Sequence, residues 1–264
     1  MIISFCFLLT VSFPMEEVWE RFFEDQRDYI IVIHGKPSLE LKTEFFKHKA
    51  NILKPIDTKW GNISLVYAQN LMLEYSVNVK MADFCCILSG NCIPVKNYKY
   101  IYNNLEATPI SRFYLSESYL PIFKKKQSQW CVLSLEHIQI ILKYADIYSE
   151  IFKTFNLCDI TPFGAPDEYF YVNLLLWKNI NNFLSEGSTY CKWYNIHLGH
   201  PKEYKEISKE RLLKVEKSHY FFMRKILKEC KIKDEDIRLT EYYEPGILKK
   251  RIVLIELKEF KYLH

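Results

Sequence analysis

The sequence predicts an α/β protein whose central, mostly parallel sheet is flanked by helices. Unbroken apolar runs at 2–10, 29–33 and 84–88 indicate strands that are buried on both faces. Between the first two runs, the segment EEVWERFFEDQ at 16–26 places apolar residues at helical spacing. Parallel neighbours need such a crossover, so the opening predicts a Rossmann-like β-α-β unit.

The size and composition are those of a folded protein. With 264 residues, of which 49% are hydrophobic and 16% aromatic, the chain can bury a full core. No internal repeat, low-complexity tract or linker divides it, so we expect one domain over residues 1–264. The formal net charge of +4 argues against a dedicated nucleic-acid-binding protein, but it permits a local basic pocket for a phosphorylated small molecule.

The first apolar run is the one candidate for a targeting signal. It has no basic region ahead of it, and its 12 residues, 2–13, are too short to span a bilayer. We therefore expect a buried strand, no transmembrane segment and a cytoplasmic protein. A cleaved signal peptide is the alternative.

The eight cysteines lie mostly inside apolar runs, and no CxxC pair or close Cys/His cluster occurs. This pattern favours buried free thiols and argues against a structural zinc site. A secreted, disulfide-linked protein is the alternative.

Polar turns follow two of the strands, at 34–37 and at 89–94. Ligands of open α/β sheets bind at the carboxyl ends of strands, so both turns are candidate ligand sites, with a plain turn as the alternative for the second. No Gly-x-Gly-x-x-Gly or Walker sequence follows the first strand, and the chain has only seven glycines. Phosphates would therefore have to be held by side chains.

The rest of the chain continues the alternation of strands and helices. Helices are predicted at 62–78, 135–144 and 205–217, and short strands at 112–115 and 131–133. The three lysines at 124–126 are typical of a solvated loop, although they could also meet an anionic ligand.

Pro166, Asp167 and Glu168 precede the apolar run 169–177. Proline suits the first turn of a helix, and acids there are stabilised by free N–H groups and the helix dipole. We therefore expect Glu168 at a helix start, where its carboxylate can act as a general base. A helix cap without catalytic function is the alternative.

Eight short motifs occur in one order along nearly the whole chain. They are IISFCFLLT, YIIVIHGKP, WGNISLVYAQNLM, FCCILSGNCIPVKN, KKQSQWCVLSLEH, GAPDEYFYVNLL, HPKEY and FFMRKI. In this order they resemble the core 2 and I-branching N-acetylglucosaminyltransferase family, which includes peptide O-xylosyltransferases and plant and microbial relatives. Each motif is weak alone, but eight in order make chance agreement improbable.

The resemblance implies a GT-A-type fold and an inverting, metal-independent transfer of a sugar from a UDP-sugar to a glycan or glycoprotein acceptor. It implies a donor-binding half at about 1–110 and an acceptor and catalytic half at about 111–264. Glu168 matches the catalytic base. The diphosphate would be met by Lys225, Lys202 and Arg224, the uridine by His34, and the sugar and acceptor by Asp167, Trp130, Ser89 and Asn91.

The chemistry requires such a set of residues. An alcohol needs a base on the face opposite the leaving group, and departing UDP needs a divalent ion or fixed cations. The one Asp-x-Asp sequence, at 234–236, lies in a charged stretch and is interpreted as a solvated turn, so we expect no metal and no other cofactor.

Three departures from the family are evident. The Golgi members carry a membrane anchor and stem, the first phosphate cation here is Lys202 instead of arginine, and residues 239–264 have no counterpart. A non-catalytic carbohydrate- or partner-binding protein on the same scaffold is the alternative function. The sequence does not distinguish N-acetylglucosamine from xylose or glucuronic acid as the transferred sugar.

Overall fold

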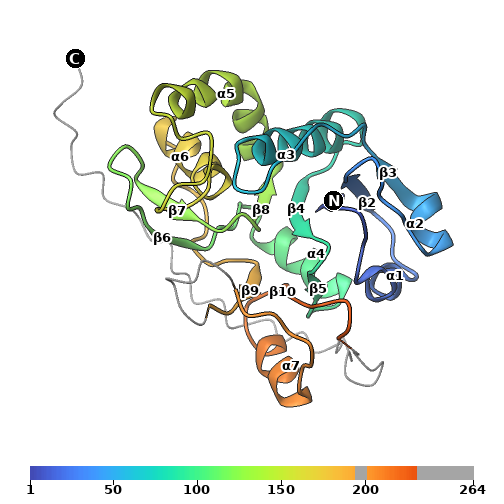
Figure 1. Ribbon diagram of the computed structural model, residues 1–264. Coiled ribbons are helices and arrows are strands. Elements are labelled where there is room, and N and C mark those ends of the chain that lie inside the picture. Colours follow the sequence, from blue (N-terminus) through green and yellow to red (C-terminus); the bar gives the residue numbers. More distant parts are fainter. Residues whose placement is uncertain (194–200, 231–264) are drawn as a thin grey trace.

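The computed structural model describes residues 1–193 and 201–230 (Figure 1). A central sheet of five strands has the order β3-β2-β1-β4-β8. Its strands are β1 (Ile3–Leu8), β2 (Tyr29–His34), β3 (Ala50–Ile52), β4 (Phe84–Ser89) and β8 (Val132–Ser134). The first four are parallel, and only β8 at the edge is antiparallel. The predicted α/β fold with a mostly parallel sheet is therefore confirmed.

Helices cover both faces of this sheet because neighbouring residues of a strand point to opposite sides. Phe5 of β1 packs on Trp19 and Phe22, whereas Cys6 faces the second half of the core. The first face is covered by α1 (Glu16–Phe23), α2 (Glu44–Lys49) and α4 (Tyr98–Ala107). The second is covered by α3 (Ser64–Glu74), its π-helical continuation η1 (Tyr75–Val79), α5 (Leu135–Thr154) and α6 (Phe170–Trp177).

Two smaller sheets complete the described part of the chain. The three-stranded sheet has the order β5-β10-β9, with β5 (Ile93–Pro94), β10 (Phe222–Arg224) and β9 (Thr189–Cys191). It lies next to α7 (Lys209–Glu216), below the central sheet in Figure 1. The antiparallel hairpin of β6 (Leu115–Glu117) and β7 (Lys125–Gln127) lies beside α6.

Several sequence expectations can be compared with this fold. The first apolar run forms β1, a buried central strand, as expected. All eight cysteines are free, and only Cys158 and Cys191 are partly exposed. Within the described ranges, no helix is both long and apolar enough to cross a membrane. The cytoplasmic location stays a prediction, as do the single domain and its two halves.

Two element predictions are wrong, and one predicted helix is longer than expected. Residues 112–115 do not form a strand, because Arg112 makes only single bridges to Val132 and Leu184 and β6 begins at Leu115. The helix expected at 135–144 continues to Thr154. The lysines at 124–126 do not form a solvated loop, because Lys125 and Lys126 belong to β7.

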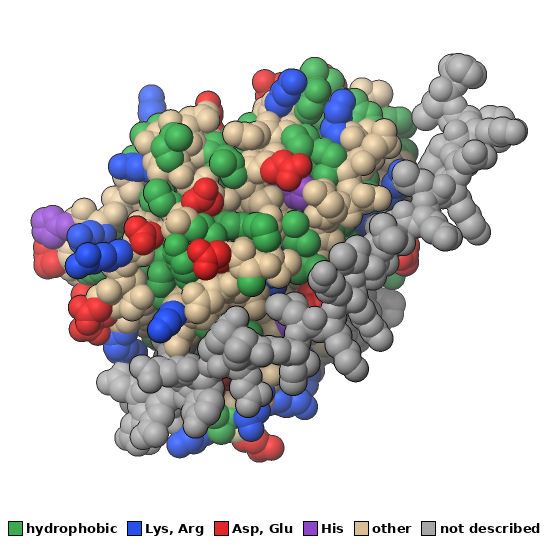
Figure 2. Space-filling model, turned by 180° about the vertical axis from the view of Figure 1, so that it is seen from behind, with side chains coloured by type: hydrophobic (Ala, Val, Ile, Leu, Met, Phe, Trp, Pro, Cys, Tyr) green, Lys and Arg blue, Asp and Glu red, His purple; other side chains and the backbone are tan. Residues whose placement is uncertain are grey.

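Acidic and basic side chains are interspersed on the face shown in Figure 2. A nucleic-acid-binding protein would be expected to carry a stripe of one sign. This face shows a mixture of both signs, and the expectation that the protein does not bind nucleic acid stays a prediction.

Candidate active site

The carboxyl ends of neighbouring parallel strands bring the two predicted ligand turns to one edge of the sheet. His34 of β2 and Ser89 of β4 are both in register with Leu8 of β1. They are therefore two strands apart, about 10 Å by ordinary strand spacing. This edge is where ligands of open α/β sheets bind.

His34 supports the strand end. Its side chain is buried, and Nε2 accepts a hydrogen bond of 3.1 Å from the backbone N–H of Ile56. Burial lowers the pKa of His34, and the charge of Lys36 lowers it further, so the ring is held neutral. Nδ1 is buried and has no partner within the described residues. A role in binding uridine stays a prediction.

Reciprocal hydrogen bonds join the turn after β4 to the end of β10. The side chain of Asn91 donates to the carbonyl of Ile226 at 2.8 Å, and the N–H of Ile226 donates to the carbonyl of Asn91 at 2.9 Å. Ser89 is buried, and its hydroxyl contacts the Cys92 thiol at 3.2 Å. Asn91 thus positions the backbone beside Lys225, while the sugar-lining roles of Ser89 and Asn91 stay predictions.

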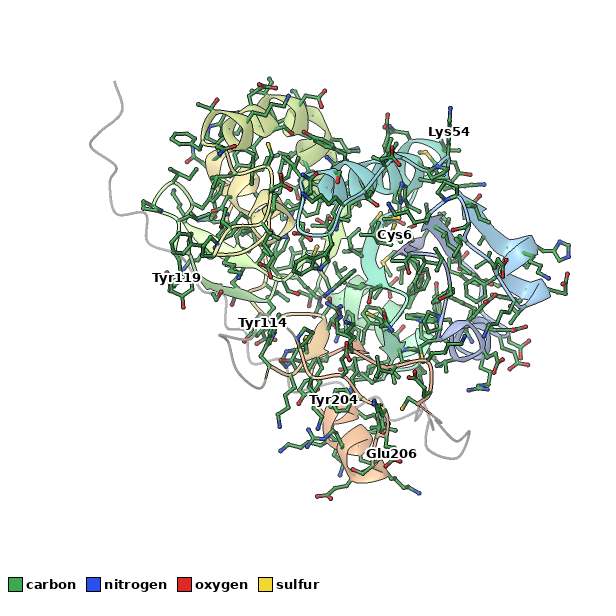
Figure 3. All side chains as sticks on the ribbon, in the orientation of Figure 1. Cys6, Lys54, Tyr114, Tyr119, Tyr204 and Glu206 are labelled. Carbon is green, nitrogen blue, oxygen red and sulfur yellow. The ribbon has the colours of Figure 1, made fainter. Side chains whose placement is uncertain are left out.

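The two predicted phosphate-binding lysines are brought together. The N–H of Lys225 lies 3.5 Å from the carbonyl of Lys202, and the N–H of Tyr204 donates to the carbonyl of Lys225 at 2.8 Å. Nζ of Lys225 pairs with Glu203 at 2.8 Å, and Nζ of Lys202 lies 5.0 Å from the centre of the Tyr204 ring. Figure 3 shows Tyr204 beside α7. Residues 197–200 of the predicted turn lie outside the described residues.

Arg224 stacks on Trp130. Its guanidinium carbon lies 4.4 Å from the ring centre, and its Nε is buried with no partner among the described residues. Trp130 is only 6% exposed, so its evident role is to hold Arg224. Whether Trp130 lines the sugar site stays a prediction. The positive charge of Arg224 also reaches Asp167, whose pKa it lowers in part.

Glu168 ends a single turn of 3-10 helix, η2 (Pro166–Glu168), which precedes α6. Its Oε2 accepts a hydrogen bond of 3.2 Å from the N–H of Ala165 and pairs with Nζ of Lys126 at 3.0 Å. The expected capping contact is therefore present, although the α-helix itself begins at Phe170. Oε1 makes no hydrogen bond within the described part of the chain, and the side chain is 25% exposed. One oxygen is thus anchored while the other can receive a proton.

Gly164 lies directly against this ion pair. Its φ of +136° is unfavourable for other residues, and a Cβ atom would lie 2.7 Å from Oε2 of Glu168 and 2.9 Å from Nζ of Lys126. Sequence reasoning missed both Gly164 and Lys126. The glycine two residues ahead of Pro166 was the signal that could have indicated close packing here.

Asp167 is 4% exposed, and its Oδ1 is buried with no partner among the described residues. Burial raises the pKa of Asp167 to about 7, with a further contribution from the negative charge of Glu168. Lys126 and Arg224 oppose this shift. Asp167 therefore exchanges a proton near neutral pH, and its role in lining the sugar or acceptor stays a prediction.

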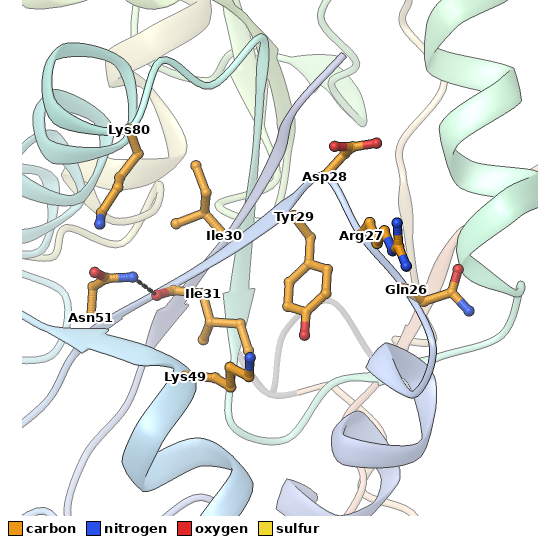
Figure 4. Close-up of a pocket in the computed structure, with 9 residues that line it drawn as sticks. All are labelled: Gln26, Arg27, Asp28, Tyr29, Ile30, Ile31, Lys49, Asn51 and Lys80. Carbon is orange, nitrogen blue, oxygen red and sulfur yellow. Dashed lines mark hydrogen bonds between the residues drawn. The ribbon is translucent and has the colours of Figure 1, made fainter.

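A cavity of about 380 Å³ lies at the opposite end of the sheet (Figure 4). It is lined by Gln26, Arg27, Asp28, Tyr29, Ile30, Ile31, Lys49, Asn51 and Lys80. None of these is a predicted site residue, and the lining carries both signs of charge. In the described ranges, no three His, Cys, Asp or Glu side chains gather as a metal site would require. Residues 234–236 lie outside those ranges.

A carboxylate with one available oxygen can act as a general base, and fixed cations can stabilise an anionic leaving group. Residues 3–127 match the family model for the Core-2/I-Branching enzyme. Glycosyltransferase BC10 of Oryza sativa subsp. japonica is 22% identical over 172 residues, which are 57% of this chain and 43% of that protein. These matches confirm the resemblance to the core-2/I-branching family and support glycosyl transfer as the class of activity.

The matches cover only part of this chain and part of that relative. The chain spans less than half the length of that relative, and the family match ends at Gln127, ahead of Glu168. The family match therefore does not reach Glu168, Lys202, Arg224 or Lys225, and their roles stay predictions.

Proposed function

We propose that this protein is an inverting, metal-independent glycosyltransferase that moves a sugar, such as N-acetylglucosamine or xylose, from a UDP-sugar to an acceptor hydroxyl. The observation that carries the proposal is the Glu168 carboxylate, with Oε2 anchored by Ala165 and Lys126 and Oε1 available. An acid that only capped the turn would need no second anchor.

In the proposed reaction, the acceptor hydroxyl attacks the anomeric carbon of the donor sugar. Its proton moves to Oε1 of Glu168 as the new carbon–oxygen bond forms. The bond between the anomeric carbon and the diphosphate oxygen breaks, and UDP leaves with the electron pair. Because attack and departure occur on opposite faces, the anomeric configuration inverts.

The departing diphosphate gains negative charge, which Lys225, Lys202 and Arg224 would meet. Preorganised cations stabilise such a transition state by several kcal/mol. Glu203, which pairs with Lys225, is half exposed, so it can turn into solvent when phosphate binds. The cations take the part that a divalent ion takes in other transferases, which supports metal independence.

One experiment tests this function. Hydrolysis of a panel of UDP-sugars would be measured in excess EDTA, together with calorimetric binding of UDP. We expect turnover of at least one donor and UDP affinity in the micromolar-to-millimolar range, because charge-assisted contacts to phosphate do not need a metal. Activity restored only by manganese would overturn metal independence. Binding of UDP without turnover of any donor would instead indicate the non-catalytic binding protein.

A further inference from the structure

Lys126 contacts the proposed base directly, although its sequence context indicated a solvated loop or a contact with an anionic ligand. Its Nζ lies 3.0 Å from Oε2 of Glu168 and 3.4 Å from the carbonyl of Phe163. The Lys126 and Glu168 side chains are 24% and 25% exposed, so solvent screens this pair less than a fully exposed one. Gly164 leaves the space that this pair occupies.

Both neighbours of Lys126 in the strand are hydrogen-bonded to α6, the helix that follows Glu168. Asn173 of α6 accepts from the N–H of Lys125 at 3.1 Å and donates to the carbonyl of Lys125 at 2.7 Å. The side chain of Gln127 accepts from the N–H of Val172 at 2.6 Å. Strand β7 and the turn that carries Glu168 are therefore held as one unit.

Lys125, the preceding residue of the same strand, provides the contrast. Neighbouring strand residues point to opposite faces, and Lys125 pairs with Glu117, which is 82% exposed. Such a pair contributes little to stability or orientation. Lys126 instead faces two carboxyl groups, those of Asp167 and Glu168.

We propose that Lys126 is a positioning residue, which fixes Oε2 of Glu168 so that Oε1 is presented to the acceptor. This inference rests on the proposed function. A base must lie within hydrogen-bond reach of the proton that it takes, so a carboxylate free to rotate would often be misaligned.

The test compares Lys126→Met, Lys126→Arg and the matched control Lys125→Met, with hydrolysis of the best UDP-sugar as the readout. We expect Lys126→Met to lower kcat by roughly 10–100-fold, with KM for the donor changed by no more than about twofold. Lys126→Arg should restore most of the rate, and Lys125→Met should behave like the wild type.

A Lys126→Met protein whose kcat is within about threefold of that of Lys125→Met would overturn the inference. A fall in kcat with no recovery in Lys126→Arg would also overturn it, since loss of a purely structural contact would give that result. Failure of the proposed function is distinct, because the wild-type protein would then hydrolyse no UDP-sugar.

Discussion

The two ends of the candidate site are built differently. At the carboxylate end, Gly164, Ala165 and Glu168 lie within five residues of one another. Lys126 packs so closely against them that a Cβ atom on Gly164 would have no room. At the phosphate end, Lys202 and Lys225 come from separate segments and point partly into solvent. Proton transfer needs accurate geometry, whereas Coulomb attraction falls slowly with distance. On the proposed function, the base is therefore fixed by close packing, whereas the phosphate end depends less on exact placement.

The largest expected effect tests the rigid end. Glu168→Gln keeps the shape and the capping oxygen but removes the proton acceptor, so turnover should fall by roughly 10²–10⁴. UDP affinity should not change, and the lost ion pair with Lys126 should cost about 1 kcal/mol or less of stability. Glu117→Gln, an exposed and ion-paired glutamate on β6, is the matched control. Near-normal transfer by Glu168→Gln would leave Glu168 as a cap only and remove the contrast between the two ends.

The next effect tests the adaptable end. Lys225→Ala should weaken UDP binding about tenfold or more, because a charge-assisted contact to phosphate is lost. Its melting temperature should stay close to that of the wild type, since the partner Glu203 is about half exposed. Calorimetry with UDP measures the affinity, and Lys228→Ala, an exposed lysine three residues later, is the control. Equal affinity in both variants would show that the phosphates bind elsewhere.

The smallest effect concerns the buried acid between the two ends. The folded protein raises the pKa of Asp167 from 3.8 to about 7, so it binds that proton more tightly than the unfolded chain does. The stability that this tighter proton binding contributes is fully present below the unfolded-state pKa of 3.8, and it is lost as pH rises through about 7. The neutral side chain of Asp167→Asn does not lose stability in this way. The difference in melting temperature between this variant and the wild type should therefore increase in favour of the variant, by a few degrees between about pH 4 and pH 8.

Thermal melts at several pH values measure this change. Asp146→Asn, which alters an exposed acid on α5, should show no such trend. If the difference between Asp167→Asn and wild type is the same at every pH, then Asp167 keeps its charge on folding and is paired in solution.

Much of the fold could be predicted because burial on both faces leaves a direct trace in the sequence. The runs that became β1, β2 and β4 are unbroken and apolar, which only a doubly covered sheet requires. Residues 112–115 gave no reliable signal, because a segment with single bridges has neither the length nor the alternation of a strand.

The candidate site was predictable where chemistry depends on local sequence. The capping contact of Glu168 follows from its place after Pro166, within three residues of the N–H that it accepts from. Lys126 could not be found this way, because its partner is remote in sequence and a run of lysines normally lies in solvent. The burial of Asp167 was equally hidden, since acids are almost never fully buried unless they are paired.

The hydrogen bonds between Asn91 and Ile226 also bear on how the chain folds during synthesis. Synthesis proceeds from the amino terminus, and domains begin to fold in that direction. The strands β1 to β4 and β8 are complete once residue 134 has been added, so the central sheet can assemble early. Lys225, and the partner that holds the Asn91 turn, arrive more than 90 residues later. A nascent or truncated chain that ends before β10 would therefore contain the strands of the central sheet, Glu168 and Lys202 but would lack Arg224 and Lys225. On the proposed function, two of the three phosphate-binding cations are absent until this late strand has been made.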